Sequence, residues 1–316
     1  MCSSQRTSKR YGIECRDVPL FDPGTHLLSE FSTSRNINLW SLEYLIATST
    51  RLLDIVKCSI STRKGGISLS REEVIERIIE NVAKGYRCSE ISETLRRANE
   101  FLEETARGLI DNGYYVREVV IELASRGVIG ASSDFGRLLF EWGLAFDPYL
   151  NLPYIPASTL KGAVRSAYLK ACKAMNISDR ECRVKADELF GSTESAGKIG
   201  FSDAYPIECT TYLIVPDVIT PHYAGGKSVK YEKDAMPEPI RYLSINKGVK
   251  FKFLIFHSKD VEGKELIENP NNVRRVDDLR LLDRALLLSL GLGVGGKTLS
   301  GYSQFKIVSY TKKYIG

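Results

Sequence analysis

The chain has few of the residues that most often carry catalysis or bind metals. Its 316 residues include only three histidines, His26, His222 and His257, and none of its seven cysteines forms a C-x-x-C pair. The acidic residues are dispersed and show no metal-ligand spacing. Neither a Ser-His-Asp or Cys-His nucleophile nor a zinc site is indicated. We therefore expect no catalytic residue, no metal and no cofactor.

The odd number of scattered cysteines also argues against a disulfide framework, and it favours a reducing compartment. No apolar run reaches the ~18 residues that a membrane-spanning helix needs. The first ten residues, Met1 to Arg10, are polar and basic and lack the apolar core of a signal peptide. These features predict a cytoplasmic protein without a membrane partner.

What is present is ordinary for a soluble globular protein, with 43% hydrophobic and 26% charged residues. The net charge of +5 and the pI near 8.7 permit a polyanionic partner such as nucleic acid without requiring one.

The chain divides into two regions of different pattern. Residues 1–112 are predicted to be mainly helical, with apolar residues at helical spacing over 70–82 and again over 89–110. Asp111-Asn-Gly113 supplies the turn chemistry that ends this region. It holds no group of chemically active side chains, so a helical scaffold or docking surface is the favoured interpretation.

Residues 113–316 predict an α+β domain. Strands are expected over 116–123, 198–204, 250–256 and 302–310, with helices starting at Ser158 and spanning about 276–290. The order strand, helix, strands, helix, strand is that of a ferredoxin-like, RRM-like fold. A turn-rich insertion at about 206–240 interrupts it. The segment Lys247–Leu254 lacks two aromatics of the base-stacking pattern of RNA-recognition motifs, so this sheet is not expected to stack bases.

Gly291-Leu-Gly-Val-Gly-Gly-Lys-Thr298 matches the P-loop pattern of nucleotide-binding proteins. A phosphate-binding P-loop follows a strand and opens a helix, whereas this one follows a predicted helix and precedes a predicted strand. The order disfavours an NTPase. The segment is better interpreted as a glycine-rich, lysine-bearing loop that approaches a nucleic-acid backbone closely, because glycine has no Cβ.

The helix that begins at Ser158 is a second candidate phosphate site. Its free N–H groups and positive dipole end would lie beside Lys161 and Arg165, which share one helix face. The alternative is a capped amphipathic helix whose basic residues are solvated. In the insertion, His222 is the histidine best placed to contact a ligand.

Four short segments together resemble the RAMP proteins of CRISPR effector complexes, and within them the sixth subunits of the type III-B (Cmr) complex. The segments are Leu152–Arg165, Glu188–Ala204, Thr220–Tyr223 and Gly291–Tyr302. Their order and spacing cover the chain from about residue 116 to the end. Pro156-Ala157 departs from the family, which usually has Pro-Gly there.

The resemblance implies an RNA-binding subunit without nuclease activity. Such a subunit would cap the repeating backbone subunit near the 3′ end of the CRISPR RNA and contact other RAMP subunits and target RNA. The residues expected to bind RNA are Ser158, Thr159, Lys161, Arg165, His222, Tyr223, Lys227, Gly293, Gly295, Gly296, Lys297, Thr298 and Tyr302. The main alternative is a RAMP-fold, metal-independent endoribonuclease that processes CRISPR RNA, with His222 or His26 as general acid or base.

Overall fold

The computed structural model describes residues 86–133, 135, 142–220, 239–258, 261, 266 and 279–313. The chain forms two compact units, Met1–Gly85 and Tyr86–Gly316. The helix predicted over 70–82 lies outside the described residues. The second unit includes α5 (Ser92–Asp111), although the sequence groups this helix with the N-terminal helical region 1–112.

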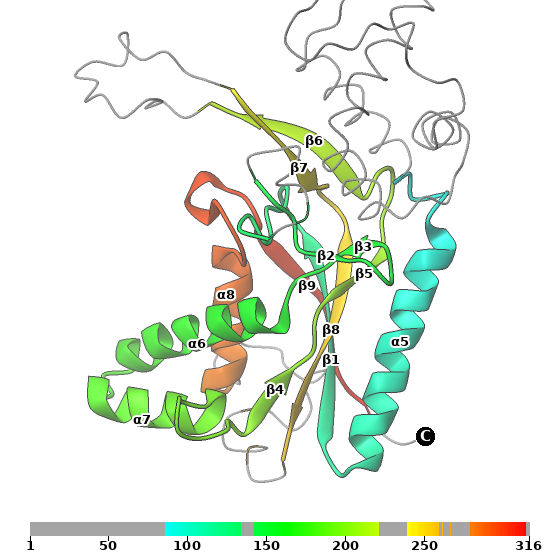
Figure 1. Cartoon of the computed structure of the whole chain (residues 1–316). Helices are drawn as coiled ribbons and strands as arrows, with labels where there is room; N and C mark the ends of the chain where they lie inside the picture. Colours follow the sequence, from blue (N-terminus) through cyan, green and yellow to red (C-terminus); the bar gives the residue numbers. More distant parts are fainter. Residues whose placement is uncertain are drawn as a thin grey trace, which may run out of the picture. The chain divides into compact units, whose positions relative to one another are not determined.

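The second unit is built on an antiparallel sheet (Figure 1). β1 (Tyr115–Leu123) lies between β8 (Lys250–His257) and β9 (Phe305–Lys313). β4 (Ile199–Phe201) and β5 (Tyr205–Glu208) pair with the other edge of β8. The order β4-β8-β1-β9 is the strand order of the β-α-β-β-α-β fold. The predicted α+β, ferredoxin-like architecture is therefore confirmed for these strands.

Helices cover both faces of this sheet (Figure 1). α6 (Ala157–Ala174) and α8 (Leu281–Leu292) lie on one face, and α7 (Asp179–Phe190) packs against α6. α5 lies on the opposite face and buries the stripe Leu95, Ala98, Leu102 and Ala106, spaced three or four residues apart. Because helices cover both faces of the sheet, consecutive residues of β1 are buried although their side chains point to opposite faces.

Four charged side chains lie between α5 and the sheet. Lys252 Nζ is 2.8 Å from Glu103 of α5 and 3.0 Å from Glu118 of β1, and Lys313 Nζ contacts the same two carboxylates. Burial alone would raise the pKa of Glu103, but the two lysines lower it to about 2. The prediction that this sheet face does not stack bases agrees with its being covered by α5.

The insertion contains a β-hairpin, not only a loop. β6 (Ile214–Ile219) and β7 (Ile240–Ile245) pair antiparallel along their whole length. A bridge between Gly127 and Ile245 attaches the base of this hairpin to the end of β1. A second, small hairpin is formed by β2 (Phe146–Asp147) and β3 (Leu152–Pro153).

The expectation that the cysteines are unpaired is wrong for four of them. Cys172 of α6 is bonded to Cys182 of α7, and Cys88 is bonded to Cys209 across 121 residues of sequence. The odd number of cysteines and the lack of C-x-x-C pairs are poor guides here, because tertiary packing decides which distant cysteines meet. These bonds remove the cysteine argument for a reducing compartment, so the cytoplasmic location stays a prediction.

Within the described residues, none of the helices is long and apolar enough to cross a membrane.

Candidate nucleic-acid interface

The glycine-rich segment lies between a helix and a strand. α8 ends at Leu292, Gly293 follows it with φ of 106°, and a short 3₁₀ turn, η4 (Thr298–Ser300), leads toward β9. The helix–loop–strand order predicted from the sequence is confirmed. Apart from this 3₁₀ turn, no helix follows Thr298 in the described residues up to 313, whereas a P-loop requires an α-helix there to direct N–H groups at a phosphate.

We therefore expect no ATP binding, despite the sequence match at Gly296-Lys297-Thr298. Titration of the full chain with MgATP in a calorimeter is expected to give only heats of dilution, for wild type and Lys297→Ala alike. Micromolar binding that disappears in Lys297→Ala would contradict this expectation.

The loop backbone is bonded to the segment that follows β1. Gly296 N–H donates to the carbonyl of Val128 at 2.6 Å, and Ser303 N–H donates to the carbonyl of Arg126 at 2.8 Å. A Cβ on Gly295 would lie 2.6 Å from the Val128 oxygen. Gly295 thus has a structural reason to be glycine, since the close approach that it allows is to the chain itself, whereas a Cβ on Gly296 would meet Val128 less closely, at 3.2 Å. Their contact with RNA stays a prediction.

Lys297 is the exposed cation of this loop. It has left-handed backbone angles, with φ of 56°, and its Nζ lies 5.0 Å from the centroid of the Trp142 ring. The centroid of the Trp142 ring also lies 4.8 Å from that of the Tyr242 ring. A cation over an indole face is held by the ring quadrupole but keeps its charge for a further ligand.

Asp217 of β6 ties this loop to the hairpin. Its carboxylate accepts a hydrogen bond from the Tyr302 hydroxyl at 3.2 Å. It also forms an ion pair with Arg126 at 2.8 Å. The carboxylate side chain is 9% exposed, whereas that of Arg126 is 48% exposed. The glycine loop, the end of β1 and the hairpin base are therefore fixed relative to one another.

The start of α6 differs from the prediction in one respect. The N-cap is Pro156, so Ser158 lies in the first turn and does not cap the helix. Instead Asp203, from the connection between β4 and β5, accepts a hydrogen bond from Ala157 N–H at 2.6 Å. Thr159 and Leu160 donate to the Pro156 carbonyl. The donors that were expected to receive phosphate are largely occupied, and a carboxylate lies beside them.

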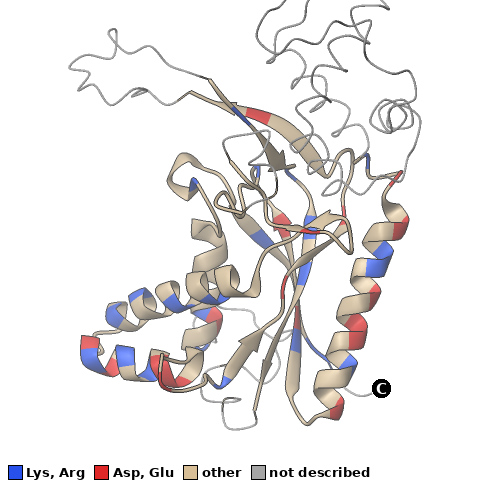
Figure 2. Ribbon diagram, in the orientation of Figure 1, with Lys and Arg blue, Asp and Glu red and all other residues tan. Residues whose placement is uncertain are grey.

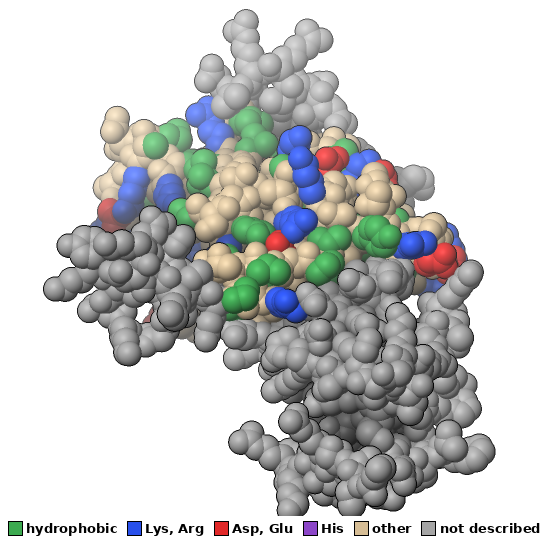
Figure 3. Space-filling view, turned by 90° about the horizontal axis from the view of Figure 1, so that it is seen from above, with side chains coloured by type: hydrophobic (Ala, Val, Ile, Leu, Met, Phe, Trp, Pro, Cys, Tyr) green, Lys and Arg blue, Asp and Glu red, His purple; other side chains and the backbone are tan. Residues whose placement is uncertain are grey.

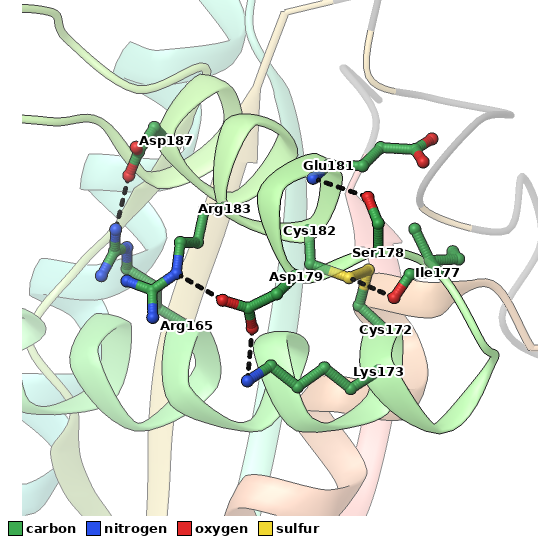
Figure 4. A network of polar contacts seen from close by, with 10 residues as sticks. All are labelled: Arg165, Cys172, Lys173, Ile177, Ser178, Asp179, Glu181, Cys182, Arg183 and Asp187. Carbon is green, nitrogen blue, oxygen red and sulfur yellow. Dashed lines mark hydrogen bonds and ion pairs between the residues drawn. A yellow bond between two sulfur atoms is a disulfide. The ribbon is translucent and has the colours of Figure 1, made fainter.

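The cations of α6 and α7 are mostly neutralised by acids (Figure 4). Arg165 pairs with Asp187, while Lys173 and Arg183 both pair with Asp179. Lys161 has no ion-pair partner among the residues that the structure describes. Of the two cations predicted on this helix face, only Lys161 keeps an uncompensated charge.

Comparison with known proteins identifies the family. The RAMP superfamily matches residues 139–306 of the chain. The CRISPR system CMR subunit Cmr6 of Saccharolobus solfataricus is 35% identical over 230 residues, which cover 73% of this chain and 69% of that protein. This chain belongs to the Cmr6 family of the RAMP superfamily. A chain in the cryo-EM structure of the type III-B Cmr-beta bound to cognate target RNA superposes with a TM-score of 0.67 and 27% identity. That match covers 91% of this chain and 96% of the other.

In this Cmr6-family chain, the structure describes some of the residues predicted to bind RNA and leaves others undescribed. Gly293, Lys297 and Tyr302 belong to one ordered loop, and Ser158, Thr159 and Lys161 belong to the first turn and a half of α6. His222, Tyr223 and Lys227 lie outside the described residues.

The sequence analysis missed the residues that contact the glycine loop and its neighbouring segment. Arg126, Trp142 and Asp217 come from three separate segments, and they meet only because the hairpin base bonds to the end of β1. The one available signal was the rarity of tryptophan, with two in the chain.

Proposed function

We propose that this Cmr6-family protein is a non-catalytic RNA-binding subunit of a type III-B CRISPR ribonucleoprotein. It caps the backbone of repeating subunits near the 3′ end of the CRISPR RNA and supports recognition of foreign RNA. Its partners are the CRISPR RNA, the target RNA and other RAMP subunits. Support comes from the relative's designation as a CMR subunit and from the structural neighbour in a complex bound to cognate target RNA.

The single observation that carries the proposal is the loop at Lys297. It presents an exposed cation beside an indole ring, on a backbone fixed at both ends. No acidic partner for Lys297 occurs within the described part of the chain. Cations that neutralise phosphates and rings that stack bases are the features by which single-stranded RNA is held without regard to sequence.

Replacing cations in this interface is expected to reduce the salt dependence of RNA binding. Each phosphate contact on a single strand contributes a slope of about 0.7 to the logarithmic plot of affinity against salt. For Lys161→Gln/Lys297→Gln we therefore expect the slope to fall by about 1.4 if both lysines contact phosphate, or by about 0.7 if only one does. Fluorescence anisotropy of labelled single-stranded RNA at several KCl concentrations measures this.

The matched control is Lys185→Gln, because Lys185 is paired with Glu181 on α7. It should leave the slope unchanged. An unaltered slope in the folded Lys161→Gln/Lys297→Gln protein would remove both lysines from the interface. Since Asp203 lies at the start of α6, the larger share of the change is expected from Lys297.

The absence of catalysis has its own test. His222→Ala is expected to change target-RNA cleavage by the reconstituted complex less than twofold, because no partner for acid–base work accompanies this histidine in the sequence. A hundredfold loss in a normally assembled complex would reveal a missed active site. Incubation of the purified chain with repeat-containing RNA, without metal, tests the endoribonuclease alternative directly, since that alternative requires cleavage.

A further inference from the structure

The glycine loop is one member of a row of backbone segments at one end of the sheet. Because the sheet is antiparallel, the end of β1 and the starts of β8 and β9 lie at this same end. Ser303 N–H bonds to the Arg126 carbonyl, and Gly127 and Ile245 exchange two hydrogen bonds of 2.8 and 2.9 Å. These contacts join the glycine loop, the segment after β1 and the end of β7.

The row continues past the hairpin to the beginning of the unit. Asn246 N–H donates to the Leu213 carbonyl, and Leu213 N–H donates to the Tyr86 carbonyl, both at 2.9 Å. The Cys88–Cys209 disulfide fastens the last segment to the chain before β6. Five segments, 293–304, 124–128, 245–248, 211–213 and 86–88, are therefore joined side by side. With ~4.8 Å between neighbouring strands, the row is about 19 Å wide, enough for several nucleotides.

This row carries cations and lacks acids. Its five segments contain Lys297, Arg126, Lys247 and Arg87 but no aspartate or glutamate. Lys297, Lys247 and Arg87 are exposed, and Arg126 is half-exposed beside Asp217 of β6. Seen from above, this end of the molecule shows Lys and Arg side chains among hydrophobic ones, with few acids (Figure 3).

Elsewhere on the unit the charges are mixed. Acidic and basic residues are mixed along α5 and α7, whereas the charged residues of α6 are all basic and face the acids of α7 (Figure 2). On α5, Glu93 pairs with both Arg96 and Arg97. On α6 and α7, ion pairs neutralise most of the cations, as described above. The acid-free row therefore differs from the helical surfaces in its pairing, because three of its four cations have no ion-pair partner among the described residues.

An aromatic ring accompanies the cation at each end of the row. Lys297 lies over Trp142, and the Arg87 guanidinium lies 5.7 Å from the centroid of the Tyr212 ring. Tyr212 is itself a member of the row and is partly exposed. Cations interleaved with aromatic rings suit a single-stranded nucleic acid, whose phosphates and bases alternate, better than a duplex.

From these observations we infer that the row from Lys297 to Arg87 is a continuous path for single-stranded RNA. It extends the interface beyond the glycine loop, through Arg126 and Lys247, to the Arg87–Tyr212 pair. The inference rests on the proposed RNA-binding function and adds the course that the strand follows across the surface of the protein. The contacts are to phosphate and to base faces, so the path is independent of RNA sequence.

The test compares Arg87→Gln/Lys247→Gln in the full chain with a control of equal charge, Arg107→Gln/Lys170→Gln. The control cations are exposed on α5 and α6 and have no ion-pair partner among the described residues. Binding of a fluorescein-labelled single-stranded RNA is measured at KCl concentrations from roughly 0.05 to 0.4 M, because counterion release changes the affinity strongly over this range. We expect the row variant to lose about tenfold or more in affinity at 0.1 M salt and about 1.4 in slope. The control keeps the wild-type values.

Lys247→Gln alone is the second variant, because Lys247 lies on an exposed turn and its removal leaves the Arg87–Tyr212 contact intact. It should lose about half of the change in slope, about 0.7. Thermal unfolding of each variant confirms that the fold is kept.

The outcomes separate this inference from the function on which it rests. If wild type binds RNA and Lys297→Gln weakens it, but the row variant matches its control, the path is wrong and the RNA-binding function stands. If wild type itself shows no salt-dependent binding, the proposed function fails. If the row variant keeps RNA affinity but no longer joins the assembled complex, the row binds an acidic surface of another subunit, and the inference is overturned.

Discussion

Glu118→Gln is expected to lower the free energy of unfolding by about 3–5 kcal/mol. Glu118 lies 3.0 Å from both Lys252 and Lys313, and the Lys252 side chain is only 7% exposed. Without the Glu118 charge, Glu103 is the one carboxylate among the described residues left to compensate two lysines, and this excess positive charge in a poorly solvated place costs more than the lost attraction. Urea denaturation of wild type and variant measures the difference.

The matched control is Glu208→Gln, which breaks the pair between Glu208 and Lys250 on the same sheet. The Glu208 side chain is 58% exposed, so this change should cost less than about 1 kcal/mol. Replacing both buried partners, in Lys252→Met/Glu118→Leu, should cost much less than Glu118→Gln, because apolar groups carry no desolvation penalty. Equal effects of Glu118→Gln and Glu208→Gln would show that the cluster is no stronger than a surface pair.

Loss of the Cys88–Cys209 bond is expected to have a similarly large effect. The two cysteines are separated by 121 residues. The chain-entropy estimate for a loop of that length is about 5 kcal/mol, and removal of a native disulfide typically costs about 2–5 kcal/mol. Cys88→Ser/Cys209→Ser should lower the denaturation midpoint of the oxidised protein accordingly.

Cys172→Ser/Cys182→Ser is the comparison variant, because its bond closes a separation of only 10 residues. Its estimated effect is smaller, about 3 kcal/mol. Thiol titration of the unreduced, unfolded protein gives an independent check. A full count of seven free thiols would show that neither bond forms, whereas the two bonds use four cysteines and leave at most three.

The first disulfide also bears on the RNA path. It holds the segment that contains Arg87 against the chain near Tyr212. We therefore expect its loss to weaken the same end of the row that Arg87→Gln weakens. The stability of the unit and the shape of its acid-free end are linked through this bond.

Several features of this protein were determined by the sequence alone. The burial of Leu95, Ala98 and Leu102 follows from helical spacing, and the sheet follows from β-branched and aromatic strands in a fixed order. The predicted position of the glycine loop between a helix and a strand argued against a P-loop arrangement from the sequence alone. These results depend on periodicity and element order, which are local properties of the chain.

Only the tertiary structure decided what each element packs against. The pattern of α5 shows which side is buried, but not that it covers the sheet face opposite α6. Likewise, the partner of Gly296 is Val128, and the carboxylate at the start of α6 is Asp203, 46 residues from Ala157. Hydrophobic spacing records that a side chain leaves water, whereas the identity of its neighbour depends on how distant strands pair. The acid-free row at the end of the sheet became visible only once five distant segments were joined by backbone hydrogen bonds.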